Sequence, residues 1–553
     1  MTMKRIALLP LVIVPALLLS LTLDAQQITS DRIARASEEP QNWLTYSGGY
    51  FSQRYSALKQ IDSTNVKNLE VKWMLPNQVF GAWQSSPIVV DGIMYLTMRP
   101  NDIVAADAKN GRVFWQYRYN NSPDQRVCCG SNNRGVAILG DTLFMGTLDG
   151  HLVAVDARNG RQIWNQEVGD PKLGYSITLA PLIVKDKVII GVGGGEYGIR
   201  GYITAHDPKT GKELWRTYTV PGPGEKGFET WSAEHWKTGG GSVWVTGSYD
   251  PALNLTYWGI GNPGPDWTPS QRPGDNLYTD SVVALDADTG AIKWHYQFTP
   301  NDGYDYDSVQ VPVLADIEVN GAPTKAMLWA NRNGNFYVLD RATGKFILGK
   351  PFVKVNWLSG FDANGRPIQT PQPAGMPTYP GNQGGTNWFS PSFSPRTGLF
   401  YLSAWVDYAS IYRRQEVQYV PGRTFAGLGP LTLTPVPNSP GPGIGRRSPI
   451  NNWTDAVASG AVIAIDPKTG MEKWRFKQYD VTESGNLSTG GDVLFTGGRE
   501  GYFYALDAKT GAMLYRLIVG GQVVNGPITY LVDNKQYVTF ISGNTMVTLG
   551  LRE

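Results

Sequence analysis

The chain has 553 residues, more than one compact hydrophobic core usually supports, so it needs either several domains or a repeat architecture. Its 49 basic and 47 acidic residues nearly cancel and form no basic stripe or acidic tail, which argues against nucleic acid as a partner. With 64 glycines, 18 tryptophans and only 17% charged residues, the composition favours a turn-dense β fold over a helical or disordered chain.

The first 25 residues have the features of a secretory signal. Lys4 and Arg5 precede an apolar run over residues 6–21, and Ala25 follows it at a suitable cleavage site. A permanent membrane anchor is the alternative, but this run of about 16 residues is shorter than the ~20 needed to cross a bilayer. We therefore predict an exported, periplasmic protein whose mature part, residues 26–553, has no integral membrane segment.

One pattern recurs along the chain: a β-rich run, an Asp, two or three residues, a Gly, and an aromatic or large apolar residue shortly afterwards. The copies begin at Asp107, Asp156, Asp207, Asp286, Asp340, Asp466 and Asp507. Each copy predicts two strands joined by a tight turn, and a further apolar pair precedes it. Four strands repeated about every 50 residues are typical of a propeller blade. The Trp, Asp and Gly of the repeats are expected to dock one blade on the next, which is a structural role.

Two irregularities decide the number of blades. Residues 391–405 supply two strands whose partners come only at residues 462–474, and the Pro/Gly-rich insertion at about 407–452 is interpreted as a surface excursion. The last segment, residues 527–551, supplies three strands, and residues 68–73 are predicted to complete that sheet. We therefore predict a single all-β domain. It is an eight-bladed β-propeller with four-stranded antiparallel blades, and its ring is closed by N- and C-terminal strands, which removes exposed sheet edges.

The only two cysteines, Cys128 and Cys129, are adjacent and interrupt the repeats. Adjacent Cα atoms lie about 3.8 Å apart, closer than the ~4.4–6.8 Å usual for a disulfide, so a bond would close a tight eight-membered ring. In an exported protein the bond should still form, because neither cysteine has another partner; two free thiols are the alternative. Since the ring closes no long loop, it adds little stability. A rigid sulfur plate against a planar ligand is the more specific interpretation.

A glycine-rich run at residues 191–201 contains a formal G-x-G-x-x-G pattern. The nucleotide-binding interpretation is rejected, because the run leads into another strand and not into a helix. Glycines such as Gly194 and Gly195 are expected to let the backbone approach a flat ligand. Glu196 is then expected to point into the axis.

Acidic residues form a second group of interruptions. In an extended strand, Asp305 and Asp307 would lie on one face about 6.6 Å apart along the chain, so that their carboxylates converge on one cation. Two bare carboxylates about 4 Å apart repel by ~4 kcal/mol at an effective dielectric near 20. A buried cluster of Glu196, Asp305 and Asp307 would therefore need a multivalent ion; a solvated loop with scattered acids is the alternative. The four histidines have no zinc-ligand spacing, and no Cys-x-x-Cys-His haem motif occurs.

Together these motifs resemble the pyrroloquinoline-quinone (PQQ) alcohol dehydrogenases, the family of methanol and ethanol dehydrogenases. The resemblance runs from residue 43 to the C-terminus and rests on the vicinal cysteines, GGE-G-RG, GGGxxW, GNP and D-Y-D. It implies that the quinone lies between the cysteine ring and Trp244, with Asp305 as the catalytic base. The implied metal ligands are Glu196, Asn262, Asp305 and Asp307. The other implied cofactor contacts are Gln84, Cys128, Cys129, Arg134, Thr178, Gly194, Gly195, Arg332, Asn387 and Trp388.

The residue two positions after the base indicates which metal ion the site binds. Calcium-dependent members tend to have a small neutral residue there, whereas lanthanide-dependent members have an aspartate, as Asp307 is here. The resemblance therefore implies one lanthanide ion, with Ca²⁺ as the alternative. Two departures concern the quinone: Gln84 stands where the family usually has a glutamate, and Gly193 stands where a serine precedes the glycine pair.

The activity implied is oxidation of a small, primary alcohol, in which the base takes the hydroxyl proton and hydride passes to PQQ. Electrons would leave to a separate soluble cytochrome c. A PQQ-dependent sugar or polyol dehydrogenase is the alternative enzyme. A non-catalytic propeller scaffold, such as an outer-membrane assembly factor, is the alternative of another class, but it has no use for paired cysteines and axial acids. The sequence fixes neither the substrate nor the oligomeric state, with a homodimer among the options.

Overall fold

The computed structural model describes residues 27–232, 234–319, 321–432 and 458–552. The predicted signal segment lies outside these residues. Among the described residues, no helix has the length and apolar character needed to cross a bilayer.

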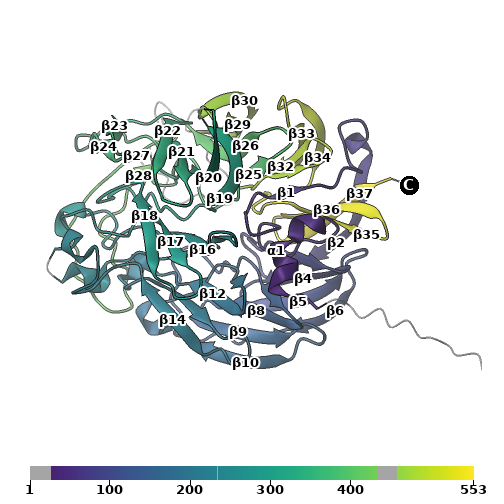
Figure 1. Ribbon diagram of the computed structural model, residues 1–553, viewed down its shortest axis with the longest axis horizontal. Coiled ribbons are helices and arrows are strands. Elements are labelled where there is room, and N and C mark those ends of the chain that lie inside the picture. Colours follow the sequence, from purple (N-terminus) through teal and green to yellow (C-terminus); the bar gives the residue numbers. More distant parts are fainter. Residues whose placement is uncertain (1–26, 233, 320, 433–457, 553) are drawn as a thin grey trace, which may run out of the picture.

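Eight four-stranded antiparallel sheets surround a central axis (Figure 1). In each sheet the first strand is innermost, because first strands of neighbouring blades contact one another, as β7 and β11 do. The first four sheets, from the axis outwards, are β3 (Ile88–Val90), β4 (Ile93–Met98), β5 (Asp102–Asp107) and β6 (Val113–Tyr117); β7 (Ala137–Leu139), β8 (Thr142–Gly146), β9 (His151–Asp156) and β10 (Gln162–Glu167); β11 (Leu182–Val184), β12 (Lys187–Gly191), β13 (Tyr202–His206) and β14 (Glu213–Tyr218); and β15 (Ser248–Asp250), β16 (Leu255–Gly259), β17 (Ser281–Asp286) and β18 (Ile292–Gln297). The other four are β19 (Val313–Val319), β20 (Ala322–Ala330), β21 (Asn335–Asp340) and β22 (Phe346–Pro351); β25 (Ser392–Ser394), β26 (Leu399–Val406), β29 (Ser459–Asp466) and β30 (Met471–Gln478); β31 (Leu487–Thr489), β32 (Val493–Gly497), β33 (Tyr502–Asp507) and β34 (Met513–Ile518); and β35 (Ile528–Val532), β36 (Lys535–Ser542), β37 (Thr545–Leu551) and β2 (Leu69–Pro76).

Few elements lie outside the blades. Strand β1 (Tyr55–Ser56) runs parallel to β31, and two ribbons pair β23 (Leu358–Phe361) with β24 (Pro367–Gln369) and β27 (Ser410–Ile411) with β28 (Leu431–Thr432). The helical elements are one short α-helix and several 3-10 turns: α1 (Ser30–Ala34), η1 (Ala36–Glu38), η2 (Val66–Asn68), η3 (Pro171–Leu173), η4 (Gly195–Tyr197), η5 (Phe228–Thr230), η6 (His235–Thr238) and η7 (Pro269–Gln271).

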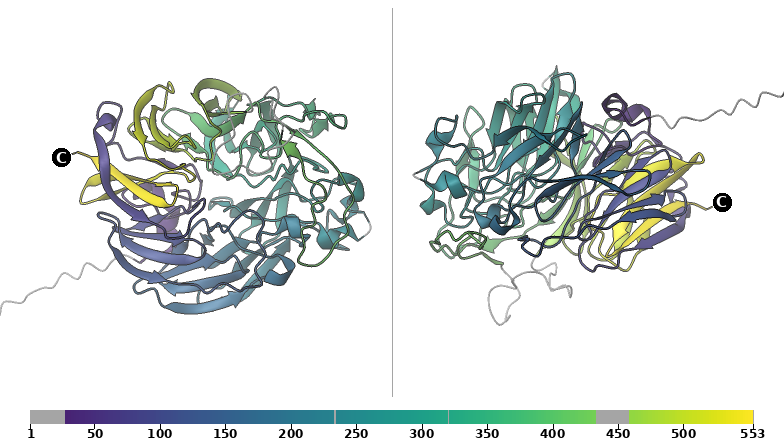
Figure 2. Two further views of the ribbon diagram at one scale, coloured as in Figure 1. Left: turned by 180° about the vertical axis from the view of Figure 1, so that it is seen from behind. Right: turned by 90° about the horizontal axis from the view of Figure 1, so that it is seen from below.

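The ring closes where the two ends of the chain meet. Strand β2 pairs antiparallel with β37, with Leu69 opposite Leu551 and Pro76 opposite Thr545. The N-terminal strand β2 and the C-terminal strand β37 lie side by side in the same sheet, as the views in Figures 1 and 2 show. The predicted eight blades, the split sixth blade and the closing strand are all confirmed.

Burial follows the position of a strand within its blade. Strand β13 is buried along its whole length because sheets pack on both of its faces, whereas the outermost strand, β14, is largely exposed. The repeat residues dock the blades as predicted. A Cβ placed on Gly211 would lie 2.9 Å from the Trp164 ring of the preceding blade, and that indole donates a hydrogen bond of 3.1 Å to the Pro208 carbonyl. Other repeats show the same contact, as between Gly160 and Trp115.

The two ends of the propeller axis have different loops. In an antiparallel four-stranded blade, the second-to-third connection and the connection to the next blade lie at the same end. Every predicted site residue lies in one of these two kinds of connection: Glu196, for example, falls between β12 and β13, and Cys128 falls between β6 and β7. The Asp/Gly turns of the repeats lie at the opposite end. The topology therefore gathers the site residues at one mouth of the ring.

Candidate active site

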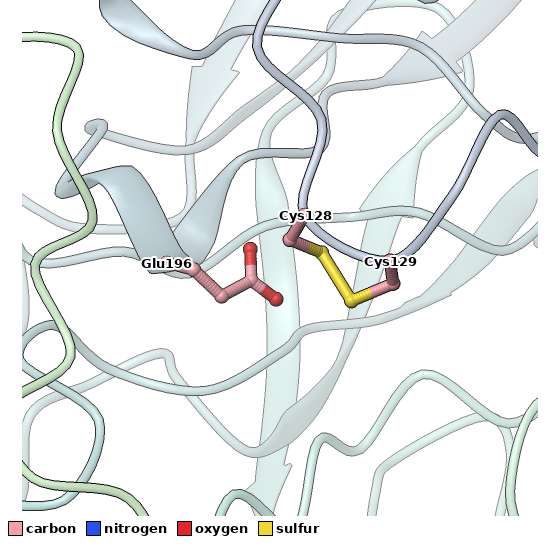
Figure 3. Close-up of side chains that lie close together, drawn as sticks. All are labelled: Cys128, Cys129 and Glu196. Carbon is pink, nitrogen blue, oxygen red and sulfur yellow. A yellow bond between two sulfur atoms is a disulfide. The ribbon is translucent and has the colours of Figure 1, made fainter. Parts of the chain in front are cut away.

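The predicted disulfide joins Cys128 to Cys129, whose Cα atoms are 3.8 Å apart. The two sulfur atoms and a carboxylate oxygen of Glu196 lie within 4.8 Å of one another. Figure 3 shows the Glu196 carboxylate pointing toward the sulfur pair. The sulfur plate and this carboxylate therefore border the same space.

Glu196 lies on the single 3-10 turn η4, and strand β13 follows directly. No α-helix follows the glycine run, which confirms that it is not a dinucleotide-binding loop. Gly194 begins the turn with a left-handed backbone (φ 116°). A Cβ on Gly195 would lie 3.0 Å from Asn262 Oδ1, so a glycine is needed for this close approach.

Asn262 is fully buried, and three of its groups have defined surroundings. Its backbone N–H donates to Asp307 Oδ1 at 2.7 Å, and its Nδ2 donates to Asp266 Oδ1 at 2.7 Å. Its Oδ1 is buried with no hydrogen-bond partner among the described residues. A buried amide oxygen without a donor is unfavourable unless something absent from the protein chain supplies a positive charge or a donor.

Asp305 and Asp307 converge, although not in the way predicted. We expected an extended strand, but the segment is irregular: Asp305 has a left-handed backbone (φ 61°), and the Asp302 carboxylate accepts from the N–H groups of Tyr304 and Tyr306. These two bonds turn the loop and replace the strand geometry. Both acids then pair with one guanidinium, since Arg332 Nη2 lies 2.7 Å from Asp305 and Nη1 lies 2.7 Å from Asp307.

The carboxyl groups of this cluster carry raised pKa values. Burial, followed by the charge of Asp307, raises the pKa of Glu196 to about 7. Burial also raises the pKa of Asp305 well above its usual range, although Arg332 opposes the shift. Burial and the charges of Glu196 and Asp307 do the same for Asp266. Arg332 and the buried Arg272 oppose these shifts only in part, so additional positive charge would favour the ionised form of these acids.

An aromatic and cationic group forms the other half of the site. Arg134 Nη1 donates to Thr178 Oγ1 at 3.0 Å and to the Trp244 carbonyl at 3.2 Å. Its guanidinium lies 4.9 Å from the Trp244 ring and 5.1 Å from the Trp388 ring. Burial lowers the pKa of Arg134 to about 10, and its Nε has no hydrogen-bond partner among the described residues. This buried cation suits an anionic, planar partner.

Two residues predicted to contact the quinone, Gln84 and Asn387, make no hydrogen bond to the other predicted site residues among those described, except the one between Asn387 and its neighbour Trp388. Gln84 is buried, and its Oε1 has no hydrogen-bond partner within the described part of the chain. The Asn387 side chain bonds within its own loop, where it accepts from the Trp388 N–H and donates to the Gln383 carbonyl. Their roles toward the quinone stay predictions.

The donor types present suit both a metal ion and a quinone, although among the described residues the Glu196 carboxylate groups within 4.8 Å with the two sulfur atoms and not with Asp305 and Asp307. Glu196, Asp305, Asp307 and the unpartnered Asn262 Oδ1 are hard oxygen donors, which a hard cation prefers. The sulfur plate, the Trp244 ring and the unpartnered Arg134 Nε offer two flat surfaces and a donor for an acidic aromatic cofactor.

The insertion has a closer relation to the site than predicted. Its described part, up to residue 432, is largely exposed, as a surface excursion should be, while residues 433–457 lie outside the described residues. It also contacts three loops that carry site residues. These contacts are Phe425 N–H to the Glu196 carbonyl (2.7 Å), Trp267 N–H to the Ala426 carbonyl (3.1 Å) and the Tyr412 hydroxyl to the Tyr304 carbonyl (3.0 Å).

Sequence reasoning missed three buried charged residues beside the cluster: Asp266, Arg272 and Asp280. Asp266 stands four positions after Asn262 in the GNPGPDW motif, and that short spacing was the available signal. Arg272 and Asp280 follow in segments whose sequence predicts only a loop, so no motif indicated that they belong to the site.

Comparisons with known proteins agree with this geometry. The family model described as glucose/ethanol/alcohol dehydrogenase, beta-propeller domain, matches residues 43–356, which carry most of the predicted site. A second model, described as outer membrane protein assembly factor BamB, matches residues 458–549, which carry repeat strands and none of the predicted site residues. The fold and the first match define the class as a β-propeller dehydrogenase.

Individual relatives narrow the class. The chain is 38% identical to quinoprotein alcohol dehydrogenase PedH of Pseudomonas putida, over 93% of this chain and 88% of that protein. It is 36% identical to the lanthanide-dependent methanol dehydrogenase of Methylacidiphilum fumariolicum, over 93% and 86%. The solved structure of a europium-containing methanol dehydrogenase superposes with a TM-score of 0.86 at 33% identity, covering 94% of this chain and all of that one. The chain belongs to the PQQ-dependent alcohol dehydrogenase family.

Proposed function

We propose that this protein oxidises small primary alcohols in the periplasm, using PQQ and one trivalent lanthanide ion, and passes the electrons to a separate cytochrome c. The observation that carries the proposal is the buried Asn262 Oδ1, which has no hydrogen-bond partner among the described residues. The residue's backbone N–H binds Asp307, and the turn of Glu196 approaches its Oδ1 closely at Gly195. Glu196, Asp305 and Asp307 bring three negative charges against the one positive charge of Arg332, so the site needs a hard multivalent cation. The choice of a lanthanide over Ca²⁺ rests on the aspartate at position 307, two residues after the base, as in lanthanide-dependent members of the family. The relatives whose names include lanthanide and europium support this choice.

The bound quinone would supply the hydride acceptor for the alcohol carbon, and the metal ion held by Glu196, Asn262, Asp305 and Asp307 would supply the positive charge that makes it a stronger acceptor. Asp305 is the base. Its carboxylate accepts the alcohol's hydroxyl proton, and Arg332, 2.7 Å away, holds the carboxylate in place. Asp307 shares the same guanidinium, so the two acids keep a fixed relative position.

The aromatic half of the site binds and orients the cofactor. Trp244 and the Cys128–Cys129 ring would hold the two faces of the quinone, and Arg134 would neutralise its acidic edge. Both cysteines of the chain are used in this ring, so neither is available to attach a haem. This use of both cysteines supports the proposed separate electron acceptor.

Reconstitution tests the proposal. Metal-free protein is mixed with PQQ plus either La³⁺ or Ca²⁺, and the bound quinone is followed by its visible absorbance. Reduction of cytochrome c is then measured with ethanol, glycerol and glucose. We expect activity with La³⁺ and preference for ethanol. Activity with Ca²⁺ alone would overturn the lanthanide assignment, preference for glucose would overturn the substrate class, and absence of bound quinone would overturn the proposed function.

A further inference from the structure

Asp266 lies directly behind the proposed metal ligand Asn262. Its Oδ1 accepts a hydrogen bond of 2.7 Å from Asn262 Nδ2, and both side chains are buried, with 3% and 0% of their surface exposed. The bond therefore forms away from bulk water, where a hydrogen bond holds the amide more strongly than it does at the surface.

The backbone around Asp266 is fixed. Arg272, which is fully buried, donates from Nη2 to the Asp266 carbonyl at 3.2 Å and from Nε to the Pro265 carbonyl at 3.1 Å. The next residue, Trp267, is held through its N–H by the carbonyl of Ala426 at 3.1 Å. The Asp266 carboxylate therefore reaches Asn262 from a rigid loop.

An asparagine amide has two chemically opposite ends. Its oxygen can bind a cation, but its NH₂ group repels one, and a rotation by half a turn exchanges them. Asp266 Oδ1 accepts from the NH₂ end in this structure, so this contact leaves the amide oxygen, Asn262 Oδ1, on the other side. That oxygen lies near the Glu196 turn, because a Cβ on Gly195 would be 3.0 Å from it.

We propose that Asp266 is a positioning residue for the metal ion: it fixes the Asn262 amide so that Oδ1, and not Nδ2, faces the cation. This inference rests on the metal site proposed above. The same hydrogen bond draws electron density toward Oδ1 and makes it a better ligand. Groups that orient a metal ligand in this way commonly contribute about 10- to 100-fold to metal affinity.

The test measures Tb³⁺ binding to metal-free protein by luminescence excited through the tryptophans, and it needs no turnover. In Asp266→Asn, the new amide can donate to Asn262 Oδ1 and turn it away from the ion, so we expect Tb³⁺ affinity to fall about 10- to 100-fold. The matched control is Asp280→Asn. Asp280 is fully buried beside the same acids, but both its oxygens lack a hydrogen-bond partner within the described residues, so it holds no ligand. We expect this control to stay within about threefold of the wild type, since it removes one carboxyl group without releasing the amide.

A swap provides the rescue. In the double variant Asn262→Asp with Asp266→Asn, the residue at 262 presents an oxygen in either orientation, and the amide at 266 donates to its other oxygen. We expect affinity within about threefold of wild type, because the pair and its net charge are kept. If Asp266→Asn does not fold, Asp266→Ala, which needs no new space, is measured in its place with the same expected loss.

The outcomes distinguish failure of the positioning role of Asp266 from failure of the metal site itself. If the wild type binds Tb³⁺ but the Asp266 variant binds as tightly, or if Asp280→Asn loses as much affinity, the positioning role is wrong and the metal site stands. If the wild type binds no Tb³⁺ at a single site, the metal site itself is wrong and this inference fails with it.

Discussion

Aspartates and glycines occur together at both ends of this propeller, but the pKa of the aspartate is lowered at one end and raised at the other. At the repeat turns, Asp207 Oδ1 accepts from the N–H groups of Lys209 and Thr210 and from the Thr210 hydroxyl. These bonds, the Thr210 hydroxyl first, lower the pKa of Asp207. At the axial mouth, burial raises the pKa of Asp305 well above its usual range.

The difference lies in the donors available, and not in the residue type. A turn aspartate finds donors within three residues of its own chain and stays solvated, so its charge stabilises the turn. Asp305 and Asp307 lie in the loop between β18 and β19, and Glu196 lies between β12 and β13. The charges of the two aspartates are balanced only in part by Arg332, which comes from a further blade. An Asp/Gly motif therefore indicates structure where its donors are local, and chemistry where they are not.

The largest expected difference between the repeat turns and the axial site is in activity, on substitution of Asp305. Asp305→Ala removes the proposed base, so we expect kcat/KM for ethanol to fall by at least about 10²–10⁴ while PQQ remains bound by absorbance. Asp207→Ala is the control, and its activity should equal that of the wild type. A loss below tenfold in Asp305→Ala would show that another group accepts the proton.

Asp307 should decide which metal ion is preferred. Asp307→Ala removes one of three ligand charges, so we expect affinity for La³⁺ to fall at least about tenfold more than affinity for Ca²⁺, since a trivalent ion loses more Coulomb energy. Competition titrations of metal-free protein give both values. Equal losses for the two ions would mean that Asp307 does not discriminate by charge.

The raised pKa values predict how metal-free protein responds to pH. Burial raises the pKa of Glu196 to about 7, so the folded state keeps a proton that the unfolded chain has already lost, and the free energy of unfolding falls as pH rises from about 5 to 8. Glu196→Gln removes this contribution. We therefore expect both proteins to melt alike at pH 5 and the variant to melt at the higher temperature at pH 8.

The comparison with Glu196→Gln is needed because histidines act in the same range. Burial lowers the pKa of His206 and of His295, which makes the folded state less stable on the acid side. Both histidines are present in wild type and variant, so their effect cancels in the difference between the two melting temperatures. A difference that does not change between pH 5 and pH 8 would contradict the raised pKa of Glu196.

Sequence could predict the propeller because its repeats are local. Each turn is specified by an Asp, a Gly and an aromatic or large apolar residue within about ten residues, and Gly211 against Trp164 shows how such a turn docks on the previous blade. The closing strand β2 was also predictable, since the last sheet had only three strands of its own.

The site could be predicted only in part. The disulfide and the glycine turn of Glu196 follow from neighbouring residues. The pairing of Asp305 and Asp307 on Arg332 and the bond from Asn262 to Asp266 depend on loops whose shape no repeat specifies. The strand expected at Asp305 was wrong because the Asp302 carboxylate turns the loop through two backbone bonds, a contact that strand periodicity does not reveal.

The smallest expected effect comes from the repeat turn itself. Asp207→Ala removes the acceptor of three hydrogen bonds at a largely solvated position, so we expect a loss of about 1 kcal/mol in the free energy of unfolding. Asp207→Asn keeps an oxygen in the same place and should lose less. Urea denaturation of the metal-loaded protein measures both, with ethanol oxidation unchanged. If Asp207→Asn reduced activity as Asp305→Ala is expected to do, the two ends of the propeller would not be chemically separate.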